Sequence, residues 1–76
     1  MGLLKLLDLK CIQWPLNVVK VKLTLEKLSP NQELIIELDK GEPQEMVQKT
    51  LKEMGYLFKT IEEDNNSIKI KILNED

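Results

Sequence analysis

Two residues near the start of the chain have side chains suited to chemistry or to binding, and they stand three positions apart. Cys11 is the only cysteine and Trp14 the only tryptophan of the 76 residues. An ionised thiol is a nucleophile. Indole does not ionise, and tryptophan serves mostly in packing and at protein interfaces. The two residues therefore indicate different functions, chemistry for Cys11 and binding for Trp14.

The composition excludes several classes of function. The chain has no histidine, which removes His-based acid–base catalysis and imidazole metal sites. One cysteine allows no intrachain disulfide and no cysteine-rich metal site, so we predict neither a metal nor a cofactor. All 11 basic residues are lysine, and the net charge is −2. Nucleic-acid binding favours arginine and a basic surface, so we do not expect it.

The first residues, MGLLKLLDLK, form an apolar run that Lys5 and Asp8 interrupt. The run is too short for the core of a signal peptide or for a membrane span. We therefore expect a soluble protein without membrane contact. A single free cysteine fits the reducing cytoplasm.

Turn residues divide the chain into the elements that must position Cys11 and Trp14. Pro15 suits the first turn of a helix, and Pro43 opens a second helix that Gly55 closes. In "IKIKI", isoleucine alternates with lysine, which predicts a strand with its lysines facing solvent. Asp8 and Asp39 stand at strand ends, where we expect turn or cap residues rather than a catalytic pair. The predicted strands cover residues 5–9, 33–38, 56–63 and 68–72, and the first helix covers 15–28.

The order β-α-β-α-β-β predicts a fold of the broad α/β class, more closely an α+β two-layer sandwich. We expect a single domain over residues 1–76. The first two strands are joined by a helix, so they are expected to be parallel, and the last two form a hairpin. The result is a four-stranded mixed sheet with two helices on one face.

The first predicted helix carries two apolar stripes. One must meet the sheet and consists of Val18, Val21, Leu25 and Leu28. The other consists of Leu16, Val19 and Leu23, with Lys22 and Glu26 between the stripes. We expect the second stripe to pack on the second helix, whose own core stripe would be Met46, Val47, Thr50, Leu51 and Met54. The alternative is a surface patch, continuous with Trp14, that binds a partner.

The stretch LDLKCIQWPLNVVKVKLTLEKL resembles the signature of the TusA/SirA family of small sulfur-carrier proteins. That signature reads roughly L-D-x-R-G-L-x-C-P-x-P-V-x-K-x-K, and the later stretch ELIIELDKGEPQEMVQKTLKEMGY resembles the family's second strand, acidic turn and second helix. The matching positions are Leu7, Asp8, Lys10 (for Arg), Ile12 (for Leu), Pro15, Val18, Lys20 and Lys22, and Asn17 fits a C-P-L-N branch of the family.

The resemblance implies the same fold, which is shared with the C-terminal domain of a translation initiation factor. It also implies the chemistry of the family, whose cysteine at the start of the first helix accepts sulfane sulfur from a cysteine desulfurase or a similar donor and passes it on. Lys20 and Lys22 would favour an anion there and steer protein partners. In this chain the position of that cysteine holds Trp14, and Cys11 stands where the family has glycine.

Three hypotheses follow for function, and whether the protein is an enzyme stays open. The first is a sulfur-relay family protein that has lost its carrier cysteine and acts as a non-catalytic protein-binding or regulatory module, with Trp14, Leu16, Val19 and Leu23 contacting the partner. The second is an active persulfide carrier that uses Cys11. The third is an interaction domain unrelated to sulfur. We expect Cys11 to be a buried, inert side chain. Trp14 either folds over the helix start as a hydrophobic staple or stays exposed as an anchor for a partner.

Overall fold

The computed structural model describes residues 3–29 and 32–73. Its elements are β1 (Leu3–Asp8), α1 (Leu16–Lys27), β2 (Gln32–Asp39), α2 (Glu42–Glu53), β3 (Leu57–Glu63) and β4 (Ser67–Leu73). The predicted order is confirmed, with boundaries within two residues of those expected. Residues 30–31, part of the predicted break before β2, lie outside the described residues.

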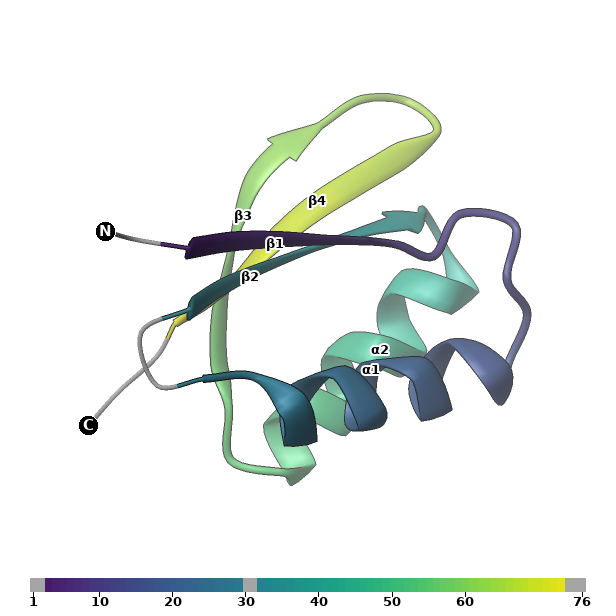
Figure 1. Cartoon of the computed structure of the whole chain (residues 1–76). Coiled ribbons are helices and arrows are strands. Elements are labelled where there is room, and N and C mark those ends of the chain that lie inside the picture. Colours follow the sequence, from purple (N-terminus) through teal and green to yellow (C-terminus); the bar gives the residue numbers. More distant parts are fainter. Residues whose placement is uncertain (1–2, 30–31, 74–76) are drawn as a thin grey trace.

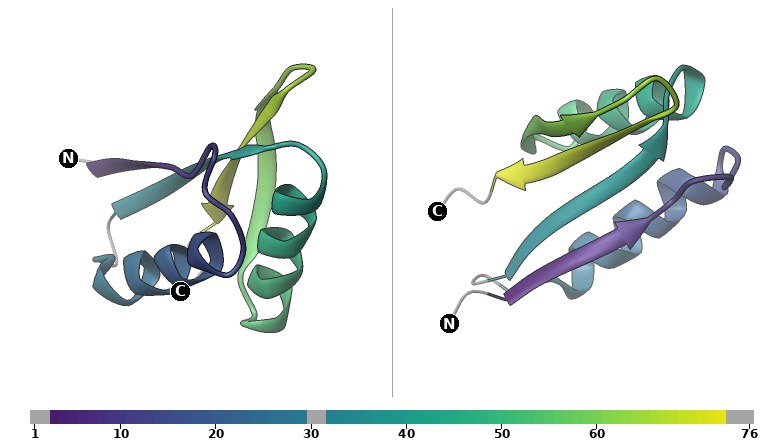
Figure 2. Two further views of the ribbon diagram at one scale, coloured as in Figure 1. Left: turned by 90° about the vertical axis from the view of Figure 1, so that its right-hand side faces the viewer. Right: turned by 90° about the horizontal axis from the view of Figure 1, so that it is seen from above.

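The four strands form one mixed sheet in the order β1-β2-β4-β3. β1 and β2 are parallel, whereas β4 is antiparallel to both β2 and β3. Both helices lie on the same face of this sheet (Figure 1). Seen from above, α1 lies under β1 and β2, and α2 lies under β4 and β3 (Figure 2). The predicted two-layer α+β sandwich is therefore confirmed.

The core lies between the sheet and the helices. The alternate side chains of the strands and one stripe of each helix point into it. In register, Ile36 of β2 stands opposite Ile70 of β4, and both are fully buried. The first stripe predicted for α1 meets the sheet as expected, with Leu28 half-buried against the core. The buried apolar residues are Leu9, Val18, Val21, Leu25, Leu34, Ile36, Leu38, Val47, Leu51, Ile68, Ile70 and Ile72.

The opposite face of the sheet carries charged side chains, as the alternation in β4 predicts. Lys69 pairs with Glu62 at 3.0 Å, and Lys71 pairs with Glu33 at 3.2 Å. These pairs cross between neighbouring strands, which suits an uncovered sheet face.

The stripe expected on α2 is only partly buried. Val47 and Leu51 are fully buried, and Met46 is half-buried, but Met54 is 41% exposed. The prediction of a core position is wrong for Met54, because this residue caps the end of α2, just before the chain turns at Gly55. Within the described ranges, no helix has the length and apolar character needed to cross a bilayer.

Candidate functional site

The loop between β1 and α1 positions Cys11 and Trp14, and two carboxylates hold its first half. Leu9 is buried and donates its backbone N–H to the carbonyl of Glu37 at 2.8 Å. The Asp8 carboxylate accepts the backbone N–H of Lys10 at 3.0 Å, and that of Asp39 accepts the N–H of Cys11 at 2.7 Å. Both acids thus serve as turn residues, as expected from their places at strand ends.

Lys10, at the position of the family's arginine, fastens the same loop to β2. Its Nζ lies 3.3 Å from Glu37 Oε2. The hydrogen bond to Glu37, together with the negative charges of Glu37 and Asp8, raises the pKa of the Lys10 ammonium above 10.5. Lys10 therefore remains protonated, and its visible role is to fix the loop.

Cys11 is exposed, so the expectation that its side chain is buried is wrong. Its φ is +67°, in the left-handed region that glycine adopts without steric cost. The loop thus keeps a left-handed turn at the position where the related signature has glycine. With its backbone N–H held by Asp39, Cys11 has a carboxylate beside it and lies outside the first turn of α1.

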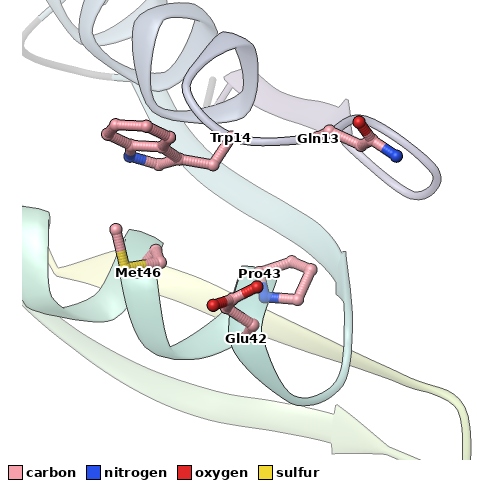
Figure 3. A pocket seen from close by; sticks show the side chains of 5 residues that line it. All are labelled: Gln13, Trp14, Glu42, Pro43 and Met46. Atoms are coloured by element: carbon pink, nitrogen blue, oxygen red, sulfur yellow. The ribbon is translucent and has the colours of Figure 1, made fainter.

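Trp14 is 60% exposed, which contradicts a staple packed over the start of α1. In Figure 3 its indole extends from the loop across a gap toward Met46 of α2. Of the two roles considered for this residue, the exposed one agrees with the structure.

The backbone N–H groups at the start of α1 are mostly engaged within the chain. Asn17 donates to the carbonyl of Gln13 at 3.2 Å, and Val19 donates to that of Pro15 at 3.0 Å. The N–H of Val18 is taken by the side-chain oxygen of Asn17 at 2.7 Å. Asn17 is fully buried, and its Nδ2 has no hydrogen-bond partner among the described residues. Few donors therefore remain at this helix start for an anion.

The second stripe of α1 does not pack on α2. Leu16 is 51%, Val19 44% and Leu23 50% exposed, on the side of α1 opposite its buried residues. The expected packing is wrong because no neighbouring element within the described residues covers these three side chains. These three residues form an apolar strip by their helical spacing, and together with the exposed Trp14, which precedes them in the chain, we call them the helix-1 surface.

Three exposed lysines border the helix-1 surface. Lys20 and Lys27 lie along one side of the strip, and Lys22 lies along the other, where the exposed Glu26 also borders it. Four ion pairs are found within residues 3–29 and 32–73, and none uses these lysines. Their charges are available to a partner, as the resemblance implies for Lys20 and Lys22.

A groove separates the loop before α1 from the first turn of α2, and no local pattern of residues indicates it. Its volume is about 460 Å³. Gln13 and Trp14 line one side, and Glu42, Pro43 and Met46 line the other (Figure 3). The two sides are far apart in sequence and meet only through packing of the helices. In the described part of the chain, no group of His, Cys, Asp or Glu has the arrangement of a metal site.

Comparison with known proteins supports the resemblance. A family model described as "Sulfurtransferase TusA" matches residues 5–73. Among solved structures, the chain is similar to a SirA-like protein from Desulfitobacterium hafniense, with 25% identity, a TM-score of 0.73 and coverage of 95% of each chain. No curated protein matches the sequence.

Proposed function

Since this chain belongs to the TusA family of sulfurtransferases, we propose that it is a sulfur-relay protein without a carrier thiol, which binds a protein partner and regulates it. The proposal depends on one observation above all. The residue at the start of α1, where the family signature has cysteine, is an exposed tryptophan. An indole forms no persulfide, so this position does not carry sulfur.

The environment of Trp14 supports this view. A carrier thiolate at a helix start gains stability from free N–H groups and from the helix dipole. Here the N–H groups of Asn17, Val18 and Val19 are bonded within the chain. Few free N–H groups therefore remain at this helix start to stabilise a thiolate.

The helix-1 surface supplies the binding function. A contiguous apolar strip on the solvent face of a helix is typical of a protein-interaction site. Tryptophan is enriched among the residues that dominate interface energetics. The bordering lysines Lys20, Lys22 and Lys27 favour a partner whose contact surface has an acidic rim.

We propose that the partner belongs to a sulfur-transfer pathway and is met in the cytoplasm. Members of the family exchange sulfur with protein donors and acceptors, which they contact near the start of the first helix. A chain that keeps this surface without the thiol occupies the docking site on a sulfur donor but accepts no sulfur from it. It then limits the access of a competent carrier.

The experiment measures binding of the chain to an immobilised cysteine desulfurase. The variant Leu23→Ser removes an apolar side chain from the helix-1 surface and is expected to weaken binding about tenfold, as for the loss of about 1.4 kcal/mol at an interface. Leu57→Ser is the matched control, because Leu57 is also 50% exposed but belongs to β3.

Binding is expected to be unchanged in the control. Equal weakening by both substitutions, or no binding of the unsubstituted chain, contradicts the proposed docking surface on this partner. Lower sulfur transfer to a competent TusA-family carrier when this chain is added supports the regulatory role.

The exposure of Cys11 favours a second candidate function, a persulfide carrier that uses the displaced thiol. A carrier thiol must react readily, and Cys11 is the only cysteine, so its alkylation rate reports on one site. Under this candidate, Cys11 reacts with iodoacetamide much faster than a cysteine in an unfolded peptide. Under our main proposal the rate equals that of the peptide.

A further inference from the structure

The groove between the loop before α1 and the first turn of α2 has a chemistry that the helix-1 surface does not use. Its walls include the indole of Trp14, the ring of Pro43 and the thioether of Met46. Glu42 contributes the one formal charge (Figure 3). The space of about 460 Å³ falls within the range of sites that take a small molecule or a long side chain.

Glu42 has no ion-pair partner among the described residues. The nearest cation along the chain, Lys40, is paired with Glu63 at 2.6 Å. Glu42 also lies in the first turn of α2, where the helix dipole stabilises a negative charge. The groove therefore presents a carboxylate, open to a ligand, on the side opposite an exposed aromatic ring.

We propose that this groove binds the side chain of an arginine from the partner protein. The planar guanidinium stacks on the face of the Trp14 indole and donates hydrogen bonds to the Glu42 carboxylate. The methylene stem of the arginine packs on Met46 and Pro43. One guanidinium group thereby contacts both the aromatic ring and the carboxylate.

Arginine fits these residues better than other side chains do. A lysine ammonium is strongly hydrated and does not stack, so it uses the ring less well. A neutral apolar side chain would cover the Glu42 carboxylate without giving it a partner, which costs free energy. An acidic side chain would be repelled. The groove thus adds a cationic contact at one end of a surface whose lysines otherwise favour acidic groups.

The assignment of the arginine to a partner protein rests on the proposed function. The preference of the groove for an arginine side chain is independent of it. Trp14 is the only tryptophan, so tryptophan fluorescence reports on ligands that contact this one side chain, and the glutamate variants below assign the change to the groove. The probe is the peptide acetyl-Gly-Arg-Gly-amide, titrated at low ionic strength. The control peptide carries citrulline, which has the shape of arginine without its charge.

We expect saturable, millimolar binding of the arginine peptide, about fivefold tighter than that of the citrulline peptide. Glu42→Gln is expected to weaken this preference, because only the contact of the cation with the ring remains. Glu45→Gln is the matched control, since Glu45 is exposed in the same helical turn but does not line the groove, and it should leave the preference intact.

Four results overturn the proposal: no saturable change in fluorescence, equal binding of both peptides, equal loss of preference in the two glutamate variants, or tighter binding of a peptide that carries norleucine in place of arginine. The last result identifies an apolar occupant instead. If the chain prefers arginine but does not bind the desulfurase, the proposed partner is wrong and the groove assignment stands. If the chain binds the desulfurase but shows no arginine preference, the groove assignment is wrong and the proposed partner stands.

Discussion

At the residue scale, the central feature is position 14, where a tryptophan with a large contact surface stands in place of the reactive cysteine of the family signature. A thiol at a helix start offers a reactive sulfur, whereas an indole offers a large, rigid surface that loses little conformational entropy on binding. Trp14 lies both on the helix-1 surface and in the groove next to α2. One side chain therefore connects the two contact regions that we assign to a partner.

The left-handed backbone at Cys11 leads to a stability prediction. A residue with a Cβ atom costs about 1 to 2 kcal/mol in this conformation, whereas glycine adds about 0.5 to 1 kcal/mol of entropy to the unfolded chain. Cys11→Gly is therefore expected to raise the free energy of unfolding by about 0.5 to 1 kcal/mol. Urea unfolding followed by far-UV circular dichroism measures the change.

Cys11→Ser separates the backbone effect from loss of the thiol, because serine keeps a Cβ atom. It should leave the free energy of unfolding within about 0.5 kcal/mol of that of the original chain. A glycine variant less stable than the serine variant contradicts the left-handed conformation at this position.

The misplaced expectation for Cys11 has a local cause. A lone cysteine in an apolar stretch is most often buried, and its neighbours Leu9 and Ile12 do pack in or against the core. The side chain of Cys11 points away from the core because the carboxylate of Asp39, from another strand, fixes the turn. A contact between residues so far apart in the chain leaves no trace in the local pattern.

At the element scale, α1 is a helix with one buried face and one apolar face in solvent. Leu25 is 7% exposed on the first face, and Leu23 is 50% exposed on the second. Leu25→Ala is expected to lower the free energy of unfolding by about 2 to 3 kcal/mol, because it opens a cavity under the sheet. Leu23→Ala, the same chemical change, should alter it by less than about 0.5 kcal/mol.

Chemical denaturation of both variants measures the difference. Equal destabilisation would mean that Leu23 is buried and that α1 has no free apolar face. The docking surface of the proposed function would then not exist.

The β3–β4 hairpin depends on one carboxylate. Asp64 accepts the backbone N–H groups of Asn66 and Ser67, each at 2.8 Å, and these bonds lower the pKa of Asp64 below its usual 3.8. Since the pKa is lower in the folded protein, the carboxylate stabilises the hairpin above pH 3.8. This contribution is lost as the pH falls through the folded pKa.

A carboxyl-detected NMR titration measures this pKa directly. In Asp64→Asn the hairpin is expected to be weaker at neutral pH, and the difference from the original chain should shrink in acid. A measured pKa of Asp64 at or above 3.8 contradicts the hydrogen bonds to the turn.

The sequence allowed all six elements and the mixed sheet to be predicted, because their signals are local. Isoleucine alternates through β4, and Pro15, Pro43 and Gly55 mark the helix ends. The packing of α1 was not predictable in the same way. Periodicity shows that Leu16, Val19 and Leu23 share a face, but not whether a neighbouring helix covers it, since this depends on how the helices meet.

At the scale of the whole molecule, the two sides of the sandwich differ in character. The open sheet face is crossed by ion pairs of Lys69 and Lys71 with glutamates. The helical side carries the helix-1 surface, its unpaired lysines and the groove with Glu42. The open face also exposes Leu4 and Leu6, so apolar area alone does not distinguish the two sides. We assign the partner to the helical side because Trp14 and the groove lie there.

The family membership and the fold concern the whole chain, but the function depends on a few side chains. The matched family model covers residues 5–73, while the proposed loss of sulfur transfer rests on Trp14. A scaffold of this kind should regain sulfur chemistry when the cysteine is restored, because α1 and its docking surface remain in place.

The most direct test is intact-mass spectrometry after incubation with a cysteine desulfurase and cysteine. We predict that the original chain gains no mass, and that Trp14→Cys in a Cys11→Ser background gains the mass of one sulfur atom. Sulfur added to the original chain and lost in the Cys11→Ser variant would contradict this prediction, because the protein would then be a carrier with a displaced thiol. Failure of the Trp14→Cys protein to load would contradict the retained docking surface.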